Sequence, residues 1–501
     1  MKRVLYPEEI ANADRYTIEV LGMPGIELMA RAGRACIEIL EKELKTEDTI
    51  LIVAGTGNNG GDAFVMAETL LGQNYSVQVI VYGVEANLKL DARHFFTRYK
   101  DKGGDFTFTK DQLQIPEYTS WVIDGLLGTG LKGPVRGTLR QWIQSVNSSP
   151  AKVFSVDIPS GNYPGGNVEH CIHADLTVTF QALKPAHVIS PGCFTCGKIS
   201  IADIGIQTEE AFKPQILALE ADDCQISSRM TISHKGTFGT LAVLGGARGM
   251  EGAAALTGLA ALRMGAGKVR IYSENQDSPK FSRPALMVDS WKGDLARENY
   301  QTWVIGPGLS KRASINHMIE KLPLESIPTL WDADGLAFLK HHLNRLKPGS
   351  WVMTPHPGEA AELLKTTSSI IQSDRLTALQ ELGTVYPGGW IILKGARSMV
   401  LSPGGTVYIS IPGNPALAVA GSGDVLSGII GGLLAQGLST EHSTLTGLLR
   451  HGLTGEHWVQ QYTDFSMLPE DMLNDLKNPV KSQPSTMPTI IIKKGNQTSN
   501  D

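Results

Sequence analysis

The sequence predicts two successive α/β domains, the first with a parallel sheet that helices cover on both faces. Three observations support this prediction. The chain has 501 residues, which is too long for one ordinary domain. Short apolar, β-branched runs alternate with helical patterns, as they do around buried parallel sheets. Around residues 207–223 this alternation gives way to a polar, acidic connector.

Composition and charge narrow the class of protein. Hydrophobic residues make up 42% of the chain and charged residues 19%, as in a globular protein with a full core. The net charge of −5 argues against nucleic acid or an anionic membrane as the main partner. The first residues lack the apolar stretch of a signal peptide, and no uncharged apolar stretch is long enough to cross a membrane. With only five cysteines, we expect a cytoplasmic protein.

The first domain begins with two helical patterns and continues with five buried strands. Helices are expected over 7–20 and 25–44, where apolar residues recur at helical spacing. Strands are expected over 49–55, 76–83, 120–128, 152–161 and 176–182. The first of these strands runs directly into a glycine-rich loop and a helix, which is the order found in phosphate-binding βα units.

A first chemical site is predicted where three of these strands end. The loop Gly55–Asp62 reads GTGNNGGD, and its glycines allow the backbone to approach a phosphate closely. Asp124 follows a later strand, and Asp157 and Ser160 follow the next one. Because parallel strands end on one edge of a sheet, these side chains can converge with Asn59 in one pocket. Taken alone, the loop is better explained as a glycine turn with a helix-capping aspartate.

The residue types at this edge indicate two kinds of chemistry. Asn59, Asp124 and Ser160 offer hard oxygen ligands, which suit an alkali or alkaline-earth cation. Asp157 is then free to act as an acid or a base. Lys184, in the segment LKPAH, either completes the site with a positive charge or is an ordinary surface lysine.

Residues 1–205 resemble the NAD(P)H-hydrate epimerase domain in the motifs LMARAG, NNGGD, GLLGTGLKGP, VDIPSG, TVTF and LKP and in the closing ADIGI. The resemblance implies a Rossmann-like three-layer fold that interconverts the R and S hydrates of NADH and NADPH, with K⁺ in the site. It implies that Asn59, Asp124 and Ser160 bind this K⁺ and that Asp157 is catalytic, and we place Lys184 with it. The substrate-binding residues that it implies are Asn58, Asn59, Gly60, Gly61, Asp62, Gly128, Thr129, Gly130, Leu131, Lys132, Gly133, Pro134 and Asp157.

Cysteine and histidine residues gather late in the first domain. Cys193 and Cys196 form a CxxC pair, with His170, Cys171 and His173 upstream. A zinc site is conceivable, but a second pair at finger-like spacing is missing. We expect incidental thiols at these positions.

A second α/β pattern follows the connector. Its strand-like runs each end in Gly, Pro or a polar residue, where ligand-binding loops lie in open α/β sheets. These runs cover 239–246, 267–273, 302–308, 329–335, 350–359 and 389–395. We place the first domain at 1–222, the second at 223–480, and a polar tail that we expect to be disordered at 481–501.

The segment GSGDVLSG, from Gly421 to Gly428, is the strongest single signal in the second domain. Asp424 follows a glycine turn and precedes a small-residue apolar helix expected over 425–434. Such a turn presents free backbone N–H groups and the positive end of a helix dipole to a phosphate. A carboxylate there is close enough to take a proton from a hydroxyl that is about to receive a phosphoryl group. The alternative is a capping aspartate on a packed helix.

Residues 227–457 resemble the ADP-dependent NAD(P)H-hydrate dehydratases of the ribokinase-like superfamily in the motifs SHKGTFG, GPGLS, DADG, TPHPGE, LKGARSMV and GSGD. The resemblance implies a ribokinase-like α/β fold, with the hydrate near Ala253, Gly308, His356 and Asp424. It also implies that Glu359 organises Mg²⁺ through water. The ADP-binding residues that it implies are Lys394, Gly395, Ala396, Arg397, Ser398 and Gly423.

Together the two resemblances imply a bifunctional family that repairs hydrated NADH and NADPH, with ADP as co-substrate and AMP and phosphate as products. Asp424 takes the proton of the hydrate's hydroxyl as a phosphoryl group is transferred to that oxygen. The phosphorylated oxygen is a good leaving group, and elimination then restores the ring double bond. Because these families tend to assemble, a homo-oligomer is expected, without a nucleic-acid or membrane partner.

Two alternatives stay open. The first is a vitamin or sugar kinase with an accessory binding domain; His356 speaks against it, because sugar kinases tend to have Asn there. The second is a non-catalytic nucleotide sensor. The presence of Asp157, Lys184 and Asp424 together speaks against that one.

Overall fold

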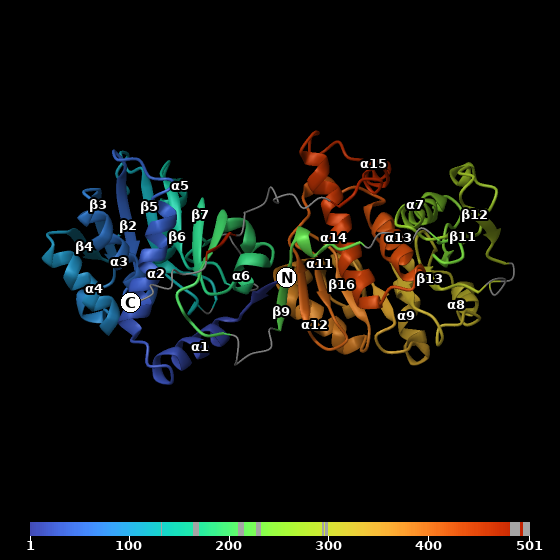
Figure 1. The fold of residues 1–501 in the computed structure, drawn as a ribbon, viewed down its shortest axis with the longest axis horizontal. Coiled ribbons are helices and arrows are strands. Elements are labelled where there is room, and N and C mark those ends of the chain that lie inside the picture. Colours follow the sequence, from blue (N-terminus) through green and yellow to red (C-terminus); the bar gives the residue numbers. More distant parts are fainter. Residues whose placement is uncertain are drawn as a thin grey trace. The chain divides into compact units, whose positions relative to one another are not determined.

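The computed structural model describes residues 1–131, 133–163, 170–208, 215–226, 232–292, 295, 299–480 and 491–493. It divides the chain into two compact units. The first unit comprises Lys2–Ile216 and Thr486–Asp501, and the second comprises Leu217–Ser485 and Met1. Each unit is built around its own sheet (Figure 1).

The sheet of the first unit is parallel, with the strand order β19-β8-β7-β6-β5-β2-β3-β4. The strands of this unit are β1 (Lys2–Val4), β2 (Thr49–Ala54), β3 (Ser76–Tyr82), β4 (Asp105–Thr109), β5 (Trp121–Gly125), β6 (Lys152–Val156), β7 (Leu176–Phe180), β8 (Lys198–Ala202) and β19 (Ile491–Lys493). Its helices are α1 (Pro7–Glu19), α2 (Gly25–Leu40), α3 (Asn58–Gly72), α4 (Leu90–Asp101), α5 (Gly137–Ser148) and α6 (Pro185–Val188).

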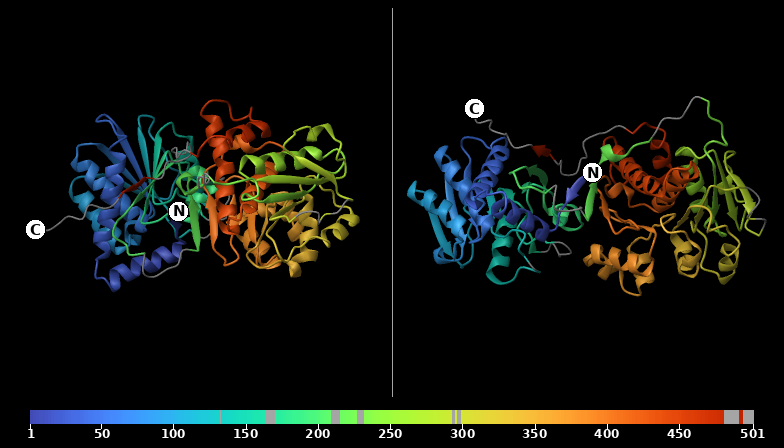
Figure 2. Two further views of the ribbon diagram at one scale, coloured as in Figure 1. Left: turned by 45° about the vertical axis from the view of Figure 1, so that its right-hand side comes forward. Right: turned by 60° about the horizontal axis from the view of Figure 1, so that its bottom comes forward.

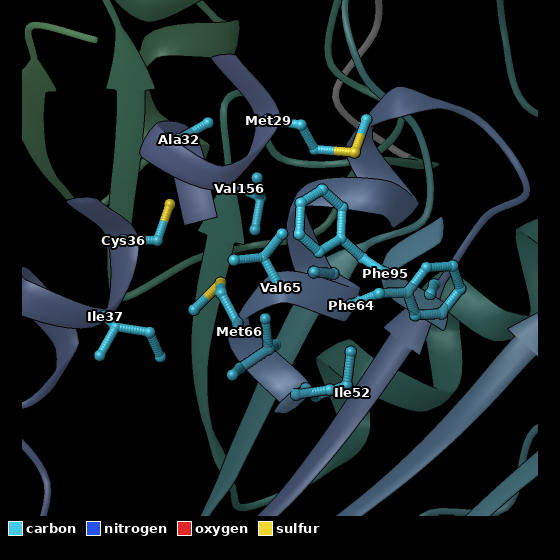
Figure 3. Close-up of a cluster of buried hydrophobic side chains, with 14 of the residues drawn as sticks. Met29, Ala32, Cys36, Ile37, Ile52, Phe64, Val65, Met66, Phe95 and Val156 are labelled. Carbon is cyan, nitrogen blue, oxygen red and sulfur yellow. The ribbon is translucent and has the colours of Figure 1, made fainter. Parts of the chain in front are cut away.

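Helices cover both faces of this sheet because its strands are apolar on both sides. Along β2, Ile50 and Ile52 face the core under α2, α3 and α4, whereas Leu51 and Val53 face the core under α5. This alternation is the two-residue period of a strand. Figure 3 shows the first of these cores, where side chains from α2, α3 and α4 meet those of β2 and β6.

The sheet of the second unit is parallel from β16 to β12 and ends in antiparallel strands on the other side, with the order β9-β18-β17-β16-β15-β14-β13-β10-β11-β12. Its strands are β9 (Ile216–Leu219), β10 (Thr240–Leu244), β11 (Lys268–Ser273), β12 (Met287–Ser290), β13 (Thr302–Ile305), β14 (Thr329–Trp331), β15 (Trp351–Met353), β16 (Trp390–Leu393), β17 (Met399–Leu401) and β18 (Val407–Ser410). Its helices are α7 (Glu251–Arg263), α8 (Ala313–Ile319), α9 (Leu336–His342), α10 (Pro357–Leu364), α11 (Ser368–Ser373), α12 (Arg375–Val385), α13 (Ser422–Ala435), α14 (Thr440–Val459) and α15 (Pro469–Asp475).

Two helices of the second unit, α7 and α13, pack unusually closely. They lie side by side on one face of the sheet, together with α14 (Figures 1 and 2). A Cβ atom on Gly428 of α13 would lie 2.2 Å from the carbonyl oxygen of Thr257 in α7. Only glycine therefore permits this approach of the two backbones.

The predicted architecture of two α/β units is confirmed, and so are the expected helices and strands. The helix predicted over 25–44 ends earlier, at Leu40, and the strand predicted over 120–128 ends at Gly125. Strands β1, β4, β8, β9, β12, β17 and β18 were not predicted. Of the tail expected to be disordered, only β19 is described, as a strand parallel to β8; the rest lies outside the described residues. None of the helices in the described part of the chain is long and apolar enough to cross a membrane.

Candidate functional site

The first unit contains a cavity of about 680 Å³ at the carboxyl ends of its central strands. The structure brings most of the predicted residues of the first site together there. The predicted residues that line it are Asn58, Asn59, Asp62, Gly128, Thr129, Gly130, Leu131, Asp157 and Lys184. Gly133 and Pro134 continue the same loop and are not in the lining, and Lys132 lies outside the described residues.

The glycines at the start of α3 serve close packing. A Cβ on Gly60 would lie 2.0 Å from the carbonyl oxygen of Gly55, and one on Gly61 would lie 2.6 Å from the sulfur of Met29. Of these two predicted substrate-binding residues, Gly60 lets α3 start directly against the end of β2, and Gly61 lets it pack closely against α2. Their packing holds Asn58 and Asn59 at the cavity.

Ser160 and Asn59 both contact the main chain of Leu127, and Ser160 is also hydrogen-bonded to Asp124. The fully buried Asp124 carboxylate accepts hydrogen bonds from Ser160 Oγ (2.5 Å), Ser160 N (2.8 Å), Ser155 Oγ (2.9 Å) and Leu126 N (3.2 Å). Burial nevertheless raises the pKa of Asp124 to about 6. Asn59 Nδ2 donates to the Leu127 carbonyl at 3.0 Å, and no hydrogen bond to its Oδ1 is found within the described residues.

Asp157 and Lys184 form a buried ion pair beside these oxygen ligands. Lys184 Nζ lies 2.7 Å from Asp157 Oδ1 and also donates to Thr179 Oγ1 (2.8 Å) and the Phe180 carbonyl (2.9 Å). Lys184 is only 1% exposed, so the surface-lysine alternative is excluded. Although burial opposes it, the ammonium group holds the pKa of Asp157 below its usual range. Asp157 stays ionised at neutral pH.

The backbone of Asp157 is strained, and a histidine that sequence reasoning missed supports it. Asp157 has a φ of 62°, in the left-handed region that non-glycine residues rarely adopt. His187 Nδ1 accepts a hydrogen bond from Lys184 N (3.0 Å), so its Nε2 carries the proton and donates to the Asp157 carbonyl (2.9 Å). Burial lowers the pKa of His187 to about 4, which keeps it neutral. The only sequence signal for this residue was its place in LKPAH.

A second cluster of charges lies at the strand ends of the second unit. Lys394 Nζ lies 2.8 Å from Asp332 Oδ1 and 3.7 Å from Glu359 Oε2. The other oxygen of Asp332 accepts a hydrogen bond from Ser427 Oγ at 2.6 Å. The ammonium group of Lys394 holds the pKa of Asp332 below its usual range. Sequence reasoning singled out DADG but gave Asp332 no role.

Asp424 lies in the first turn of α13, as predicted. The helix starts after Gly421, whose φ of 96° glycine adopts without strain. Burial, and then the nearby Asp332, raise the pKa of Asp424 to about 7 despite the charge of Lys394. The capping alternative fails, since the cap of α13 uses no side chain. A group that titrates near neutrality suits proton transfer.

The residues predicted to contact the hydrate lie on four segments, namely α7 (Ala253), the loop after β13 (Gly308), the start of α10 (His356) and α13 (Asp424). Gly308 has a φ of 60°, and a Cβ on it would lie 3.3 Å from that of Ala253 and 2.4 Å from the Met250 carbonyl. His356 caps α10: its Nδ1 accepts from Gly358 N at 3.0 Å, and its own N–H donates to Glu359 Oε2 at 2.7 Å. The cap orients the Glu359 carboxylate toward Lys394.

The predicted nucleotide loop, 394–398, divides into inward and outward parts. Gly395 and Ala396 are exposed, and Ser398 Oγ closes the loop by donating to the Gly395 carbonyl at 2.9 Å. The Arg397 guanidinium is instead buried and donates to the Ile411 carbonyl at 2.6 Å. The guanidinium group of Arg397 is therefore directed into the protein, away from the exposed part of the loop. A Cβ on Gly423 would lie 3.2 Å from Lys394 Nζ, which brings this loop next to α13.

The five cysteines are buried, and none of them forms a disulfide. Cys171 Sγ lies 3.4 Å from Thr195 Oγ1, and Cys196 Sγ approaches main-chain carbonyls. Burial raises the pKa of both thiols. Across the described residues, no cluster of three or more His, Cys, Asp or Glu side chains is arranged to hold a metal ion.

Both units match known families. The family model described as NAD(P)H-hydrate dehydratase matches residues 241–478, and that described as YjeF-related protein N-terminus matches residues 25–186. A bifunctional NAD(P)H-hydrate repair enzyme from Escherichia coli is 34% identical over 99% of this chain and 96% of its own length. One from Moorella thermoacetica is 33% identical over 96% of this chain and 97% of its own.

A solved structure is also similar to the second unit. It is an ADP/ATP-dependent NAD(P)H-hydrate dehydratase from Bacillus subtilis, co-crystallised with ATP/Mg²⁺. It is 29% identical, covers 51% of this chain and 94% of its own, and has a TM-score of 0.45. The identity and coverage of the full-length relatives establish the family: the chain belongs to the bifunctional NAD(P)H-hydrate repair enzymes.

Proposed function

We propose that this chain restores hydrated NADH and NADPH in two reactions, one in each unit. Residues 1–222 interconvert the R and S hydrates, and residues 223–480 dehydrate the S hydrate at the expense of ADP, which becomes AMP and phosphate. One observation carries the proposal. A chain that aligns with such enzymes over almost its whole length holds two separate clusters of buried charged groups, one in each unit.

In the first unit, the cavity would receive the hydrated nicotinamide ring. Asn58, Asn59 and Asp62 on α3 and the loop from Gly128 to Pro134 would bind the substrate. Asp157, ionised beside Lys184, would accept a proton from the reacting group. The rigid support of this pair is the reason for assigning it to catalysis, since a catalytic group must be held in place.

Asn59, Asp124 and Ser160 fit a potassium ion. All three offer oxygen atoms, which are the ligands of hard cations. Asn59 and Ser160 contact the main chain of Leu127, and Ser160 in turn donates to the buried Asp124 carboxylate. When bound, the ion would supply positive charge next to the cavity. Ser160 would hold the Asp124 carboxylate in position for it.

In the second unit, Asp424 would take the proton of the substrate hydroxyl as that oxygen attacks the terminal phosphorus of ADP. The oxygen–phosphorus bond forms, the bond to AMP breaks, and phosphate later leaves with the electrons of its carbon–oxygen bond. A proton leaves the neighbouring ring carbon, and the electrons of that carbon–hydrogen bond form the ring double bond. The backbone N–H groups from Gly421 to Gly423 would stabilise charge on the moving phosphoryl group. Residues 394–398 would hold the nucleotide, and Ala253, Gly308 and His356 the hydrate.

Glu359 fits the proposed role of organising Mg²⁺ through water. Its carboxylate is partly buried, is capped by the His356 N–H, and lies 3.7 Å from Lys394. Mg²⁺ commonly keeps several waters and uses few protein carboxylates, in keeping with one glutamate. When bound, the ion would neutralise charge on the phosphates.

A single assay tests this proposal against the kinase alternative. The purified protein is mixed with both hydrate epimers of NADH, ADP and Mg²⁺, and the NADH absorbance is followed. We expect recovery of both epimers. Recovery of the S form alone would contradict the epimerase assignment, and a stable phosphorylated vitamin or sugar in place of NADH would support the kinase. Light scattering of the same sample tests the proposed homo-oligomer.

A further inference from the structure

The cavity of the first unit holds one carboxyl group that the proposed chemistry leaves unused, that of Asp14. Ile10, Asp14 and Ile18 follow one another at four-residue intervals along α1, and all three line the cavity. This spacing places them on one face of the helix. Asp14 is thus a carboxyl in the middle of an otherwise apolar face. Within the described part of the chain, no group forms a hydrogen bond with it.

Asp14 shares the cavity with the charged groups of the site. It interacts electrostatically with Lys184 and Asp157, and Asp62 of α3 interacts with Asp14 in turn. The other titratable groups in the lining are Tyr82, Lys89 and Asp91. Burial outweighs the effect of Lys184 and raises the pKa of Asp14 to about 6.

The chemistry of epimerisation needs a proton donor that the Asp157–Lys184 pair does not provide. The hydroxyl to be inverted is on the ring carbon next to the ring nitrogen, and hydroxide is a poor leaving group unless it is protonated. Asp157 is ionised, and the three donors of Lys184 are taken by Asp157, Thr179 and Phe180. Asp62 also lines the cavity, but the proposed function already assigns it to substrate binding.

We propose that Asp14 is a further catalytic residue of the first unit, the acid that protonates the departing hydroxyl; this inference rests on the proposed function. The carbon–oxygen bond breaks, water leaves, and the lone pair of the ring nitrogen forms a carbon–nitrogen double bond. Water then adds to the opposite face, its proton goes to Asp157, and the electron pair returns to nitrogen. One proton has passed from Asp14 to Asp157, and cavity water returns it. No atom is gained or lost by the substrate except the exchanged hydroxyl.

The proposal has a pH signature. For the reaction to start, Asp14 must be protonated while Asp157 is ionised. The rate of epimer exchange therefore falls as the pH rises above about 6, because Asp14 then loses its proton. Oxygen-18 from labelled water should also enter the hydroxyl with each inversion.

The test compares Asp14→Asn with Glu19→Gln, which removes an exposed carboxyl from the same helix. Exchange between the two hydrate epimers of NADH is measured from pH 5 to 8, with the uncatalysed rate subtracted, and dehydration with ADP and Mg²⁺ is measured on the same samples. We expect Asp14→Asn to slow exchange by about 100-fold or more and to remove the fall above pH 6. Dehydration should be unchanged, Asp14→Glu should restore part of the exchange, and Glu19→Gln should behave as the parent.

Three outcomes would overturn the inference. The first is an exchange rate of Asp14→Asn within threefold of the parent's, and the second is a fall of that rate above pH 6 that persists in Asp14→Asn. The third is slow exchange in Asp14→Asn that is explained by a lowered melting temperature of the first unit and is not restored by Asp14→Glu. A parent protein that exchanges no epimers would instead contradict the proposed function of the first unit. The two failures are therefore distinguishable.

Discussion

Lys394 and Asp332 form an ion pair of 2.8 Å inside the second unit, with the Asp332 side chain only 2% exposed. Replacing Lys394 by methionine keeps the length of the side chain and removes its charge. The buried carboxylate is then uncompensated, which typically costs about 3–5 kcal/mol. We expect Lys394→Met to lower the melting temperature and to abolish dehydration. Lys347→Met, at an exposed lysine, is the matched control, and equal melting temperatures in the two variants would contradict the importance of the pair.

Asp424→Asn should stop dehydration and leave epimer exchange unchanged. The amide cannot take the hydroxyl proton, and loss of a general base typically slows a reaction by about two to four orders of magnitude. In the parent, Asp424 must be ionised to act, so kcat/KM for dehydration should fall as the pH drops below about 7. NADH absorbance with the S hydrate measures both effects. Near-normal dehydration by the variant would remove Asp424 from this role.

Asp157→Asn should have the converse effect. The amide cannot accept a proton, and Lys184 is left buried without its counter-ion. We expect the exchange of hydrate epimers to be lost while dehydration of the S hydrate continues. Chromatography of the epimers measures their exchange, and NADH absorbance measures dehydration. Unimpaired exchange in Asp157→Asn would show that the ion pair is structural only.

His187→Leu should destabilise the first unit and impair exchange together. Leucine is apolar and of similar size, so the change leaves the Asp157 carbonyl and the Lys184 N–H without their partners. Each unsatisfied buried group typically lowers the stability of the fold by about 1–3 kcal/mol. In the parent, the pKa of His187 is depressed on folding, so the unfolded chain binds more protons between about pH 6.5 and 4. The contribution of His187 to the free energy of unfolding is complete above about pH 6.5 and is lost as the pH falls toward 4.

A comparison of thermal unfolding at pH 7 and pH 5 checks this linkage. The parent should lose more stability than His187→Leu on acidification, because the variant has no such group to protonate. Equal losses in the two proteins would mean that other groups dominate in this range.

Gly428→Ala should be destabilising although alanine favours helices. In an open helix, this change typically gains about 0.5–1 kcal/mol. Here the new methyl group would lie 2.2 Å from the Thr257 carbonyl oxygen, so α7 and α13 must move apart. Overpacking of this kind typically costs about 1–3 kcal/mol. Thermal unfolding measures the sign, and Gly72→Ala, where a Cβ meets no atom within 4 Å, is the control.

Most of the architecture could be predicted from the sequence because buried parallel strands are continuous apolar runs. The strands β2 and β10 and the helix α13 are examples. Strands at the sheet edges were missed. β4 reads DFTFT and β12 reads MVDS, and such half-exposed, short segments carry a weak pattern. The antiparallel strands β17 and β18 were missed as well.

The sites were predictable where a residue lies in a motif, and not where it acts from a separate helix. Asp157, Lys184 and Asp424 follow glycine-rich or strand-end segments, and the structure places each inside a cluster of charges. Asp14 lies in a helix with no motif and is recognisable only once Ile10 and Ile18 are seen to line the same cavity. The roles of His187 and Asp332 depend on partners far apart in the chain, which spacing does not reveal.

The contact of α7 with α13 also limits which sequence changes the second site can accept. Main-chain atoms meet at Gly428, and Thr257 Oγ1 donates to the Asp424 carbonyl at 3.0 Å. The spacing between Ala253, on the first turn of α7, and Asp424, on the first turn of α13, thus depends on Gly428 and Thr257 within the two helices. Substitutions in the surrounding loops can therefore alter the rest of the site without displacing Asp424.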